Sequence, residues 1–168
     1  MFKKVFTVLI LSVFALGFYY SDIVFAQTTD SVTATVTLQN VSLSVSDGQI
    51  AYGTIAASSN KSTVDLTDTQ TITNDGNVPI TINISGSNSA NWTLGATAAP
   101  DTFVHSFCTS GCSSYPTGYT ALTVDYDQLA TGVAASATRS LDLNITAPTS
   151  SSVFTQQSVN VTVQAVAE

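Results

Sequence analysis

The chain has 168 residues, a formal net charge of −7 and only four lysines and arginines. Nucleic-acid binding and adhesion to anionic membranes both depend on clustered basic side chains, so this composition excludes both kinds of partner. After residue 26 the only basic residues are Lys61 and Arg139.

The first 26 residues have the pattern of an export signal. Two lysines precede an uncharged apolar run over residues 5–20, and residues 24–26 fit a signal peptidase site. The run is shorter than the roughly 20 residues that a membrane-spanning helix needs. We therefore predict cleavage after Ala26, a mature chain of residues 27–168 and a secreted or cell-surface location.

Alternation of apolar with hydroxyl-bearing side chains predicts short β-strands along the rest of the chain. Asp75-Gly76 predicts a tight turn before the strand over residues 78–84, and Pro79 predicts that this strand starts at an edge or a bulge. Helical spacing is weak and limited to residues 128–137. The predicted strands cover residues 32–38, 41–45, 50–52, 64–66, 69–73, 78–84, 92–94, 122–124, 141–145 and 159–165.

The strand pattern favours an all-β fold. One apolar face and one hydroxyl-bearing face per strand is what two packed antiparallel sheets require. The number and length of the strands predict an antiparallel two-sheet immunoglobulin-like β-sandwich after the signal peptide, with a jelly roll as the alternative. No fixed-period repeat or charge-rich linker divides residues 27–168, so we predict a single domain there.

Two stretches carry a resemblance to known surface proteins. Residues 71–87, TITNDGNVPITINISGS, resemble a stretch of secreted immunoglobulin-like domains of bacteria and archaea, and residues 140–168 resemble the end of such domains. Two narrower families are similar in part: TasA/camelysin-like proteins, which polymerise into biofilm filaments, and WxL-domain proteins, which attach to Gram-positive cell walls. Residues 91–94, Asn-Trp-Thr-Leu, resemble the first Trp-x-Leu of the WxL family, but Trp92 is the only tryptophan, so the second is absent. The resemblance implies a role at the cell surface.

The only two cysteines lie close together in the sequence HSFCTSGCSSY. In an exported protein, Cys108 and Cys112 should form a disulfide that pins the loop over residues 103–119. Metal binding and redox exchange are the alternatives. With His105 the stretch has three possible ligands where structural zinc takes four, and the three-residue gap differs from that of a redox Cys-x-x-Cys pair.

Catalytic and metal-binding patterns are weak in this chain. His105 is a candidate base for a nearby serine, but no nucleophile motif accompanies it, and one histidine with one glutamate cannot form a His-Glu-x-x-His site. Asp125 and Asp127 would share a strand face, which makes them a weak calcium candidate beside the favoured interpretation, a solvated acidic face. We therefore predict that the protein is not an enzyme and needs no cofactor.

Aromatic side chains supply the candidate contact residues. Tyr115, Tyr119 and Tyr126 combine an apolar ring with a hydroxyl that tolerates water, as exposed contact residues do. Trp92 fits a core position better than a sugar-stacking platform. Two functions follow: a structural protein of the cell surface or extracellular matrix, and alternatively a cell-wall or glycan-binding module that uses the loop over residues 103–119.

The first predicted strand gives the structural function a mechanism. Val32, Ala34, Val36 and Leu38 share one face of an alternating segment close to the mature N-terminus. This strand can pair within its own sheet, or it can add to the open edge of the next subunit. Repeated donation is a heterologous contact, so the partner would be the protein itself in an open homopolymer.

Overall fold

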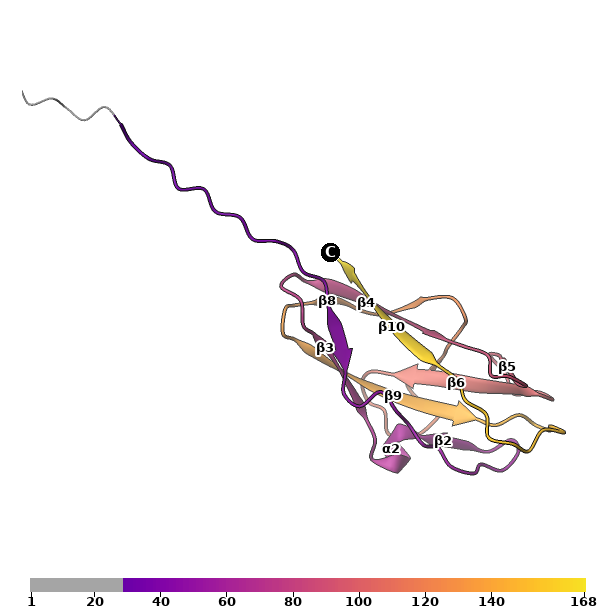
Figure 1. Ribbon diagram of the computed structural model, residues 1–168. Helices are drawn as coiled ribbons and strands as arrows, with labels where there is room; N and C mark the ends of the chain where they lie inside the picture. Colours follow the sequence, from indigo (N-terminus) through magenta and orange to yellow (C-terminus); the bar gives the residue numbers. More distant parts are fainter. Residues whose placement is uncertain (1–28) are drawn as a thin grey trace, which may run out of the picture. The chain divides into compact units, whose positions relative to one another are not determined.

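The computed structural model describes residues 29–168 (Figure 1). Residues 38–168 form one compact unit, and residues 29–37 belong to a separate one. The predicted signal peptide, the cleavage after Ala26 and the mature terminus lie outside the described residues.

The predicted strand from Val32 to Leu38 is wrong for the single chain. Residues 29–42 contain no strand or helix, and the side chains of Val32, Val36 and Leu38 are 96, 97 and 88% exposed. An apolar alternating segment forms a stable strand only when a neighbouring strand bonds its backbone and a core covers its apolar face. The sequence pattern therefore indicates a segment that is suited to strand pairing, although no strand among the described residues pairs with it.

The larger sheet has seven strands in the order β1-β3-β9-β6-β5, with β2 paired to β9 and β7 paired to β6. All of its pairings are antiparallel except β5 with β6, which is parallel. The strands are Leu43–Val45 (β1), Asn60–Ser62 (β2), Gln70–Asn74 (β3), Thr93–Leu94 (β5), Thr102–Cys108 (β6), Thr120–Ala121 (β7) and Thr138–Thr146 (β9).

The smaller sheet has three antiparallel strands in the order β10-β4-β8. They are Val161–Ala167 (β10), Ile80–Gly86 (β4) and Asp127–Val133 (β8). The pairing of β4 with β8 shifts register between Ile80 and Ile82, which confirms the irregular start that Pro79 predicted. The predicted helical spacing over residues 128–137 is wrong, because this stretch contains β8 and the turn that follows it.

A one-turn helix replaces the strand predicted at residues 64–66. Helix α2 (Thr63–Leu66) begins at a capping box, in which the Ser62 hydroxyl accepts from the Asp65 N–H and the Asp65 carboxylate accepts from the Ser62 N–H. Thr67 adopts the left-handed conformation with φ 53° and ends the helix. Two apolar residues are too few to specify a period of 2, so the local capping chemistry decides the structure here.

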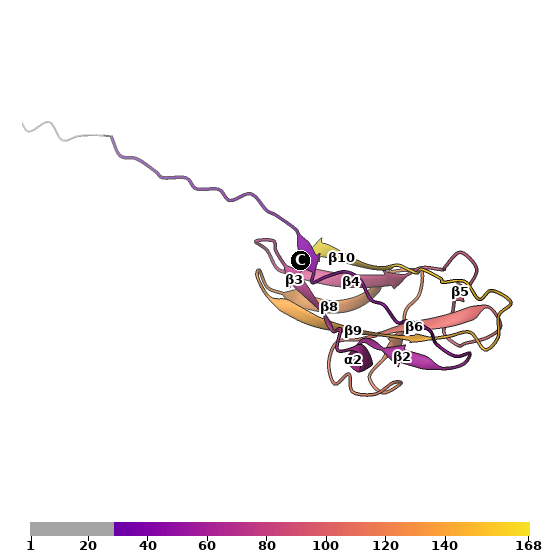
Figure 2. The ribbon, with the colours of Figure 1, turned by 60° about the horizontal axis from the view of Figure 1, so that its bottom comes forward.

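Both sheets contribute to one core (Figures 1 and 2). The long predicted strands are confirmed with small shifts of their ends as β3, β4, β9 and β10, whereas residues 50–52 and 122–124 form no strand. The all-β prediction is therefore confirmed, and the immunoglobulin-like topology stays a prediction. The prediction of purely antiparallel sheets is wrong, because β5 pairs with β6 in parallel. The fully or nearly fully buried core residues are Ile72, Ile80, Ile82, Ile84, Phe107, Leu122, Val133, Leu141 and Leu143.

Candidate functional site

The predicted disulfide is present. Cys108 at the end of β6 is bonded to Cys112, with Cα atoms 5.8 Å apart, and the Cys108 side chain is buried. The bridge closes a short ring at the start of the connection between β6 and β7. It therefore fixes the local path of that connection, as the sequence predicted.

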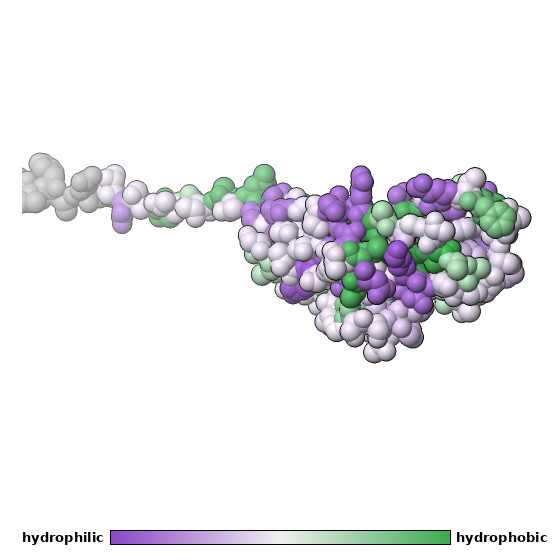
Figure 3. Space-filling view, turned by 90° about the horizontal axis from the view of Figure 1, so that it is seen from below, coloured by the Kyte–Doolittle hydropathy of each residue, from purple (hydrophilic) through white to green (hydrophobic). Residues whose placement is uncertain are grey.

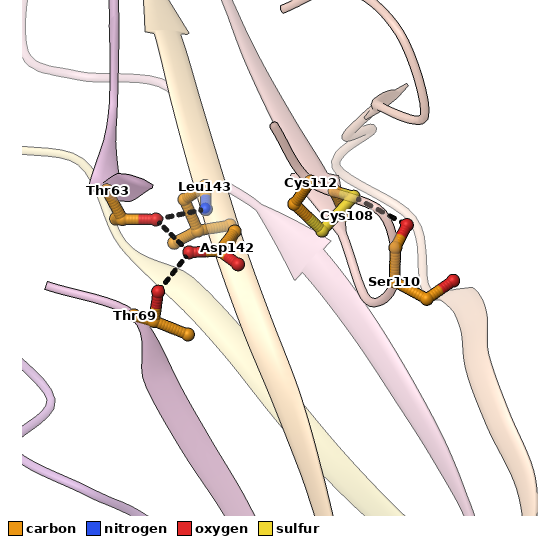
Figure 4. Close-up of a disulfide and its surroundings, with 7 residues drawn as sticks. All are labelled: Thr63, Thr69, Cys108, Ser110, Cys112, Asp142 and Leu143. Atoms are coloured by element: carbon orange, nitrogen blue, oxygen red, sulfur yellow. Dashed lines mark hydrogen bonds between the residues drawn. A yellow bond between two sulfur atoms is a disulfide. The ribbon is translucent and has the colours of Figure 1, made fainter. Parts of the chain in front are cut away.

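A buried polar cluster lies next to the disulfide on β9, the strand that pairs with β6 (Figure 4). The Asp142 carboxylate accepts from the hydroxyls of Thr63 at 2.8 Å and Thr69 at 2.6 Å. The Thr63 hydroxyl oxygen in turn accepts from the N–H of Leu143 at 3.0 Å. These groups satisfy one another, so the cluster joins α2 and the start of β3 to β9 and has the character of a structural element.

The candidate tyrosines are divided between two connections. Tyr115 and Tyr119 lie half-buried on the disulfide loop with their rings edge to face at 5.8 Å, whereas Tyr126 is exposed just before β8. The Tyr119 hydroxyl is buried near Ser62 without well-formed hydrogen-bond geometry among the described residues, and burial raises the pKa of this phenol. Tyr115 and Tyr119 thus pack mainly against each other and the domain.

The acidic pair does not share a strand face as predicted. Asp127 begins β8, but Asp125 lies in the bend before it, where the Thr123 hydroxyl donates to the Asp125 carbonyl and to the Asp127 carboxylate. Within residues 29–168 no three His, Cys, Asp or Glu side chains are grouped to hold a metal ion.

His105 lies in the interior on β6 and is 3% exposed. Its Nε2 atom lies 3.0 Å from the Tyr52 hydroxyl, and the two rings meet edge to face at 5.8 Å. Burial lowers the pKa of His105 to about 4 and raises the pKa of Tyr52, so a neutral imidazole and a neutral phenol share this hydrogen bond. Among residues 29–168 the hydrogen bond of its ring is to Tyr52 and not to a serine.

A groove of about 880 Å³ lies over the opposite face of β9 from Asp142. Its floor contains the apolar side chains of β9 and Ala147, together with His105. Residues 48–55, which cross from β1 towards β2 without forming a strand, make one wall, and residues 153–163 make the other. We call this feature the β10 groove. Figure 3 shows apolar side chains lying between hydrophilic ones on one face of the domain.

One wall of the β10 groove includes an unpaired strand edge. Within the described residues β10 pairs with β4 only. The N–H groups of Asn160 and Glu168, which flank β10, both bond on the β4 side. Because backbone groups alternate along a strand, the N–H and C=O groups of Val161, Val163 and Ala165 point away from β4 to the free edge.

Aromatic side chains mark one end of the β10 groove. Trp92 is half-buried, and its indole N–H donates to the Ser151 hydroxyl at 3.1 Å. Its ring packs at a tilt against the ring of Phe103. Phe154, on the connection between β9 and β10, is 91% exposed. The sequence assigned Trp92 to a short strand and to the core, and it singled out nothing near Phe154, which belongs to no alternating run.

Searches of protein-family models, of curated proteins and of solved structures give no match to this chain. Within residues 29–168, no helix has the length and hydropathy needed to cross a membrane.

Proposed function

We propose that this protein is a secreted, non-catalytic structural protein of the cell surface or extracellular matrix, and that it forms a homopolymer by strand donation. The immunoglobulin-like sandwich after a signal peptide belongs to the same proposal. The observation that carries it is the β10 groove, which has apolar β9 side chains in its floor and lies beside an unpaired strand edge. Such a site accepts an extended peptide through backbone hydrogen bonds and alternate side chains.

The chain itself contains a segment with the matching chemistry. Residues 32–38 alternate valine, alanine and leucine with threonine, and the larger apolar side chains among them are exposed. The segment is uncharged, as is suitable for a groove whose lining has no charged side chain. Exposed apolar side chains are unfavourable in water, and their burial contributes roughly 25 cal/mol for each Å² covered.

The length of the segment also matches the length of the channel. The floor follows β9 and its continuation from Leu141 to Ala147, which spans about 20 Å in extended chain. Residues 32–38 extend over the same distance. One copy can therefore fill the groove of another along most of its floor without a change in strand length.

The alternative, a glycan-binding module, depends on the disulfide loop. Tyr115 and Tyr119 are half-buried against each other, so their rings offer less free surface than the sequence suggested. Sedimentation of the protein with cell-wall polysaccharide tests this function directly. Saturable binding by a monomer would favour it over the homopolymer.

The decisive experiment uses chain recovered from the medium after secretion. We expect filaments in negative-stain microscopy and a mass that increases with concentration in light scattering. Deleting residues 29–37 should abolish both while leaving the thermal midpoint of the monomer unchanged. Val36→Asp places a charge on the inward face and should act like the deletion.

Thr35→Asp is the matched control, because its side chain lies on the opposite face of the same segment. We expect this variant to keep most of the assembly. A wild-type chain that stays monomeric at high concentration, with a concentration-independent thermal midpoint, would overturn the proposal.

A further inference from the structure

We propose that the donated strand runs antiparallel to β10 and that its Leu38 lies at the end of the groove where Phe154 is exposed. This inference rests on the proposed function, because it specifies how residues 32–38 of a second copy occupy the β10 groove. Direction matters because it decides whether the assembly stays open or closes into a pair.

Strand β4 runs from one end of the compact unit towards the other (Figures 1 and 2). Before β4 lies the turn containing Asn77, and there the Glu168 N–H donates to the Pro79 carbonyl. After β4, the Ser87 hydroxyl accepts from the Asn160 N–H, beside the connection that contains Phe154. We call these the Asn77 end and the Phe154 end, and the seven residues of β4 place them about 20 Å apart.

The donor segment leaves its own domain at the Asn77 end. The Asn77 side-chain amide donates to the Leu38 carbonyl at 2.8 Å, and its carbonyl oxygen accepts from the Asn40 N–H at 2.8 Å. The Asn77 N–H donates to the Asn40 carbonyl at 3.1 Å. Leu38 is therefore the root of the donor segment, and it is held beside its own Asn77 turn.

The β10 groove lies towards the other end. Its lining starts at Val45, Leu141 and Val163, halfway along the sheets, and continues to Ala147 and Phe154. The β10 residues after Val163, which approach the Asn77 end, do not line it. A strand from another copy therefore finds the open part of the channel at the Phe154 end.

These two positions select one direction. When Leu38 of a donor lies at the acceptor's Phe154 end, Val32 lies deeper in the groove, towards the Asn77 end. The donor segment then runs antiparallel to β10. The Asn77 end of one copy then meets the Phe154 end of the next, and repetition gives an open filament. The parallel direction brings two Asn77 ends together, so two copies would exchange strands in a closed dimer.

The side chains fit the antiparallel direction. The backbone groups at the free edge of β10 belong to Val161, Val163 and Ala165, whose side chains point towards the core. Residues directly opposite each other in an antiparallel pair point to the same face, so the inward-facing donor residues must lie opposite these three. With Ala34 opposite Val163, Leu38 lies opposite Val159, which lines the same groove as Phe154. Leu38 and Phe154 are 88 and 91% exposed in the single chain, and this contact would cover both.

Cross-linking between singly substituted secreted chains distinguishes the directions. A Leu38→Cys preparation is mixed with either Val159→Cys or Ala167→Cys, assembled, treated with a short bismaleimide and analysed by peptide mass mapping. The native cysteines are bonded to each other and should not react. Residues 159 and 167 are about 27 Å apart along the extended chain, so a short bismaleimide attached to residue 38 cannot reach both of them.

We expect filaments and a covalent pair between residues 38 and 159, with at least tenfold less product at residue 167. Product mainly at residue 167, or closed dimers in solution, would overturn the antiparallel direction. Filaments with neither product would overturn the β10 groove as the acceptor while leaving the homopolymer intact. Monomers without any product would instead mean that the proposed function itself fails.

Phe154→Ser supplies an independent measurement. Because the side chain is exposed, we expect the thermal midpoint of the monomer to be unchanged. The concentration needed for assembly should increase at least fivefold, since the apolar contact with Leu38 is lost. An unchanged assembly concentration would contradict the placement of Leu38 at this end.

Discussion

Strand β9 directs Asp142 and Asn144 to one side and Leu141 and Leu143 to the other, and the two sides are covered differently. The polar side chains are 6 and 1% exposed under α2, β2 and the disulfide loop, with their groups hydrogen-bonded. The two leucines are equally buried, at 2 and 3% exposed, and they belong to the lining of the β10 groove of about 880 Å³. The two sides therefore differ in what surrounds the buried side chains: a hydrogen-bonded polar cluster on one side, and the β10 groove on the other.

The largest effect should come from the polar side. Asp142→Ala leaves the hydroxyls of Thr63 and Thr69 without their acceptor. We expect a loss of about 4 kcal/mol in the free energy of unfolding, because hydrogen bonds to charged groups contribute about 1.5–3 kcal/mol each. Urea unfolding measures it. Asp142→Asn keeps an acceptor oxygen and should lose roughly half as much, and a loss below about 1 kcal/mol in the alanine variant would contradict the structural assignment.

Leu143, which follows Asp142 on β9 and points to the opposite face, should give a smaller loss of stability when it is truncated, together with a loss of assembly. Leu143→Ala removes a core side chain, and we expect a loss of about 3.5 kcal/mol in the free energy of unfolding. The variant also enlarges the floor of the β10 groove, so its folded form should assemble more weakly than that of Asp142→Ala. Light scattering of both variants, at temperatures where each is fully folded, checks this difference.

The sequence predicted the closed parts of this domain better than the open ones. Alternation located β4 and β9 because their partner strands lie in the same chain and bury one face of each. It also predicted a strand over residues 32–38, which pairs with no strand among the described residues. The local capping chemistry of Ser62 and Asp65 was present in the sequence, but two apolar residues nearby suggested a strand.

The candidate site itself could not be predicted from the sequence. The β10 groove exists because residues 48–55 cross between strands without pairing, and because β10 ends its sheet. Both are properties of the tertiary arrangement. Burial of Asp142 was equally hidden, since its acceptor role depends on hydroxyls from Thr63 and Thr69, more than 70 positions earlier in the chain.

The floor of the β10 groove should respond to acid. Burial lowers the pKa of His105 to about 4 from an ordinary value of 6.5, so the unfolded chain binds a proton first as the pH falls. Stability should be constant above about pH 6.5, decrease as the pH falls towards 4, and lose about 3 kcal/mol over that window.

The control for this prediction is His105→Gln, which retains a side chain able to bond with Tyr52 but does not titrate. Carboxylates contribute to the pH dependence of both chains, so the difference between their unfolding free energies isolates the imidazole. Chemical unfolding at intervals between pH 4 and 7 provides the data. Parallel curves for the two chains would show that the pKa of His105 is the same in the folded and the unfolded chain, so that the imidazole is more accessible than its position indicates.

The smallest effect should come from the disulfide, at the outer limit of the covered side. Cys108 and Cys112 close a ring with a sequence separation of only four, so the bridge restricts the unfolded chain by about 2 kcal/mol. Cys108→Ser combined with Cys112→Ser should lower the unfolding free energy by that amount and leave the far-ultraviolet dichroism of the β-sheets unchanged. The double variant should also assemble at the wild-type concentration, because the bridge lies beside Asp142, on the side of β9 away from the groove. Cooperative loss of β-structure on adding reductant to the wild type would show that the loop holds the domain together, and loss of assembly alone would shift the donor contact to the disulfide side.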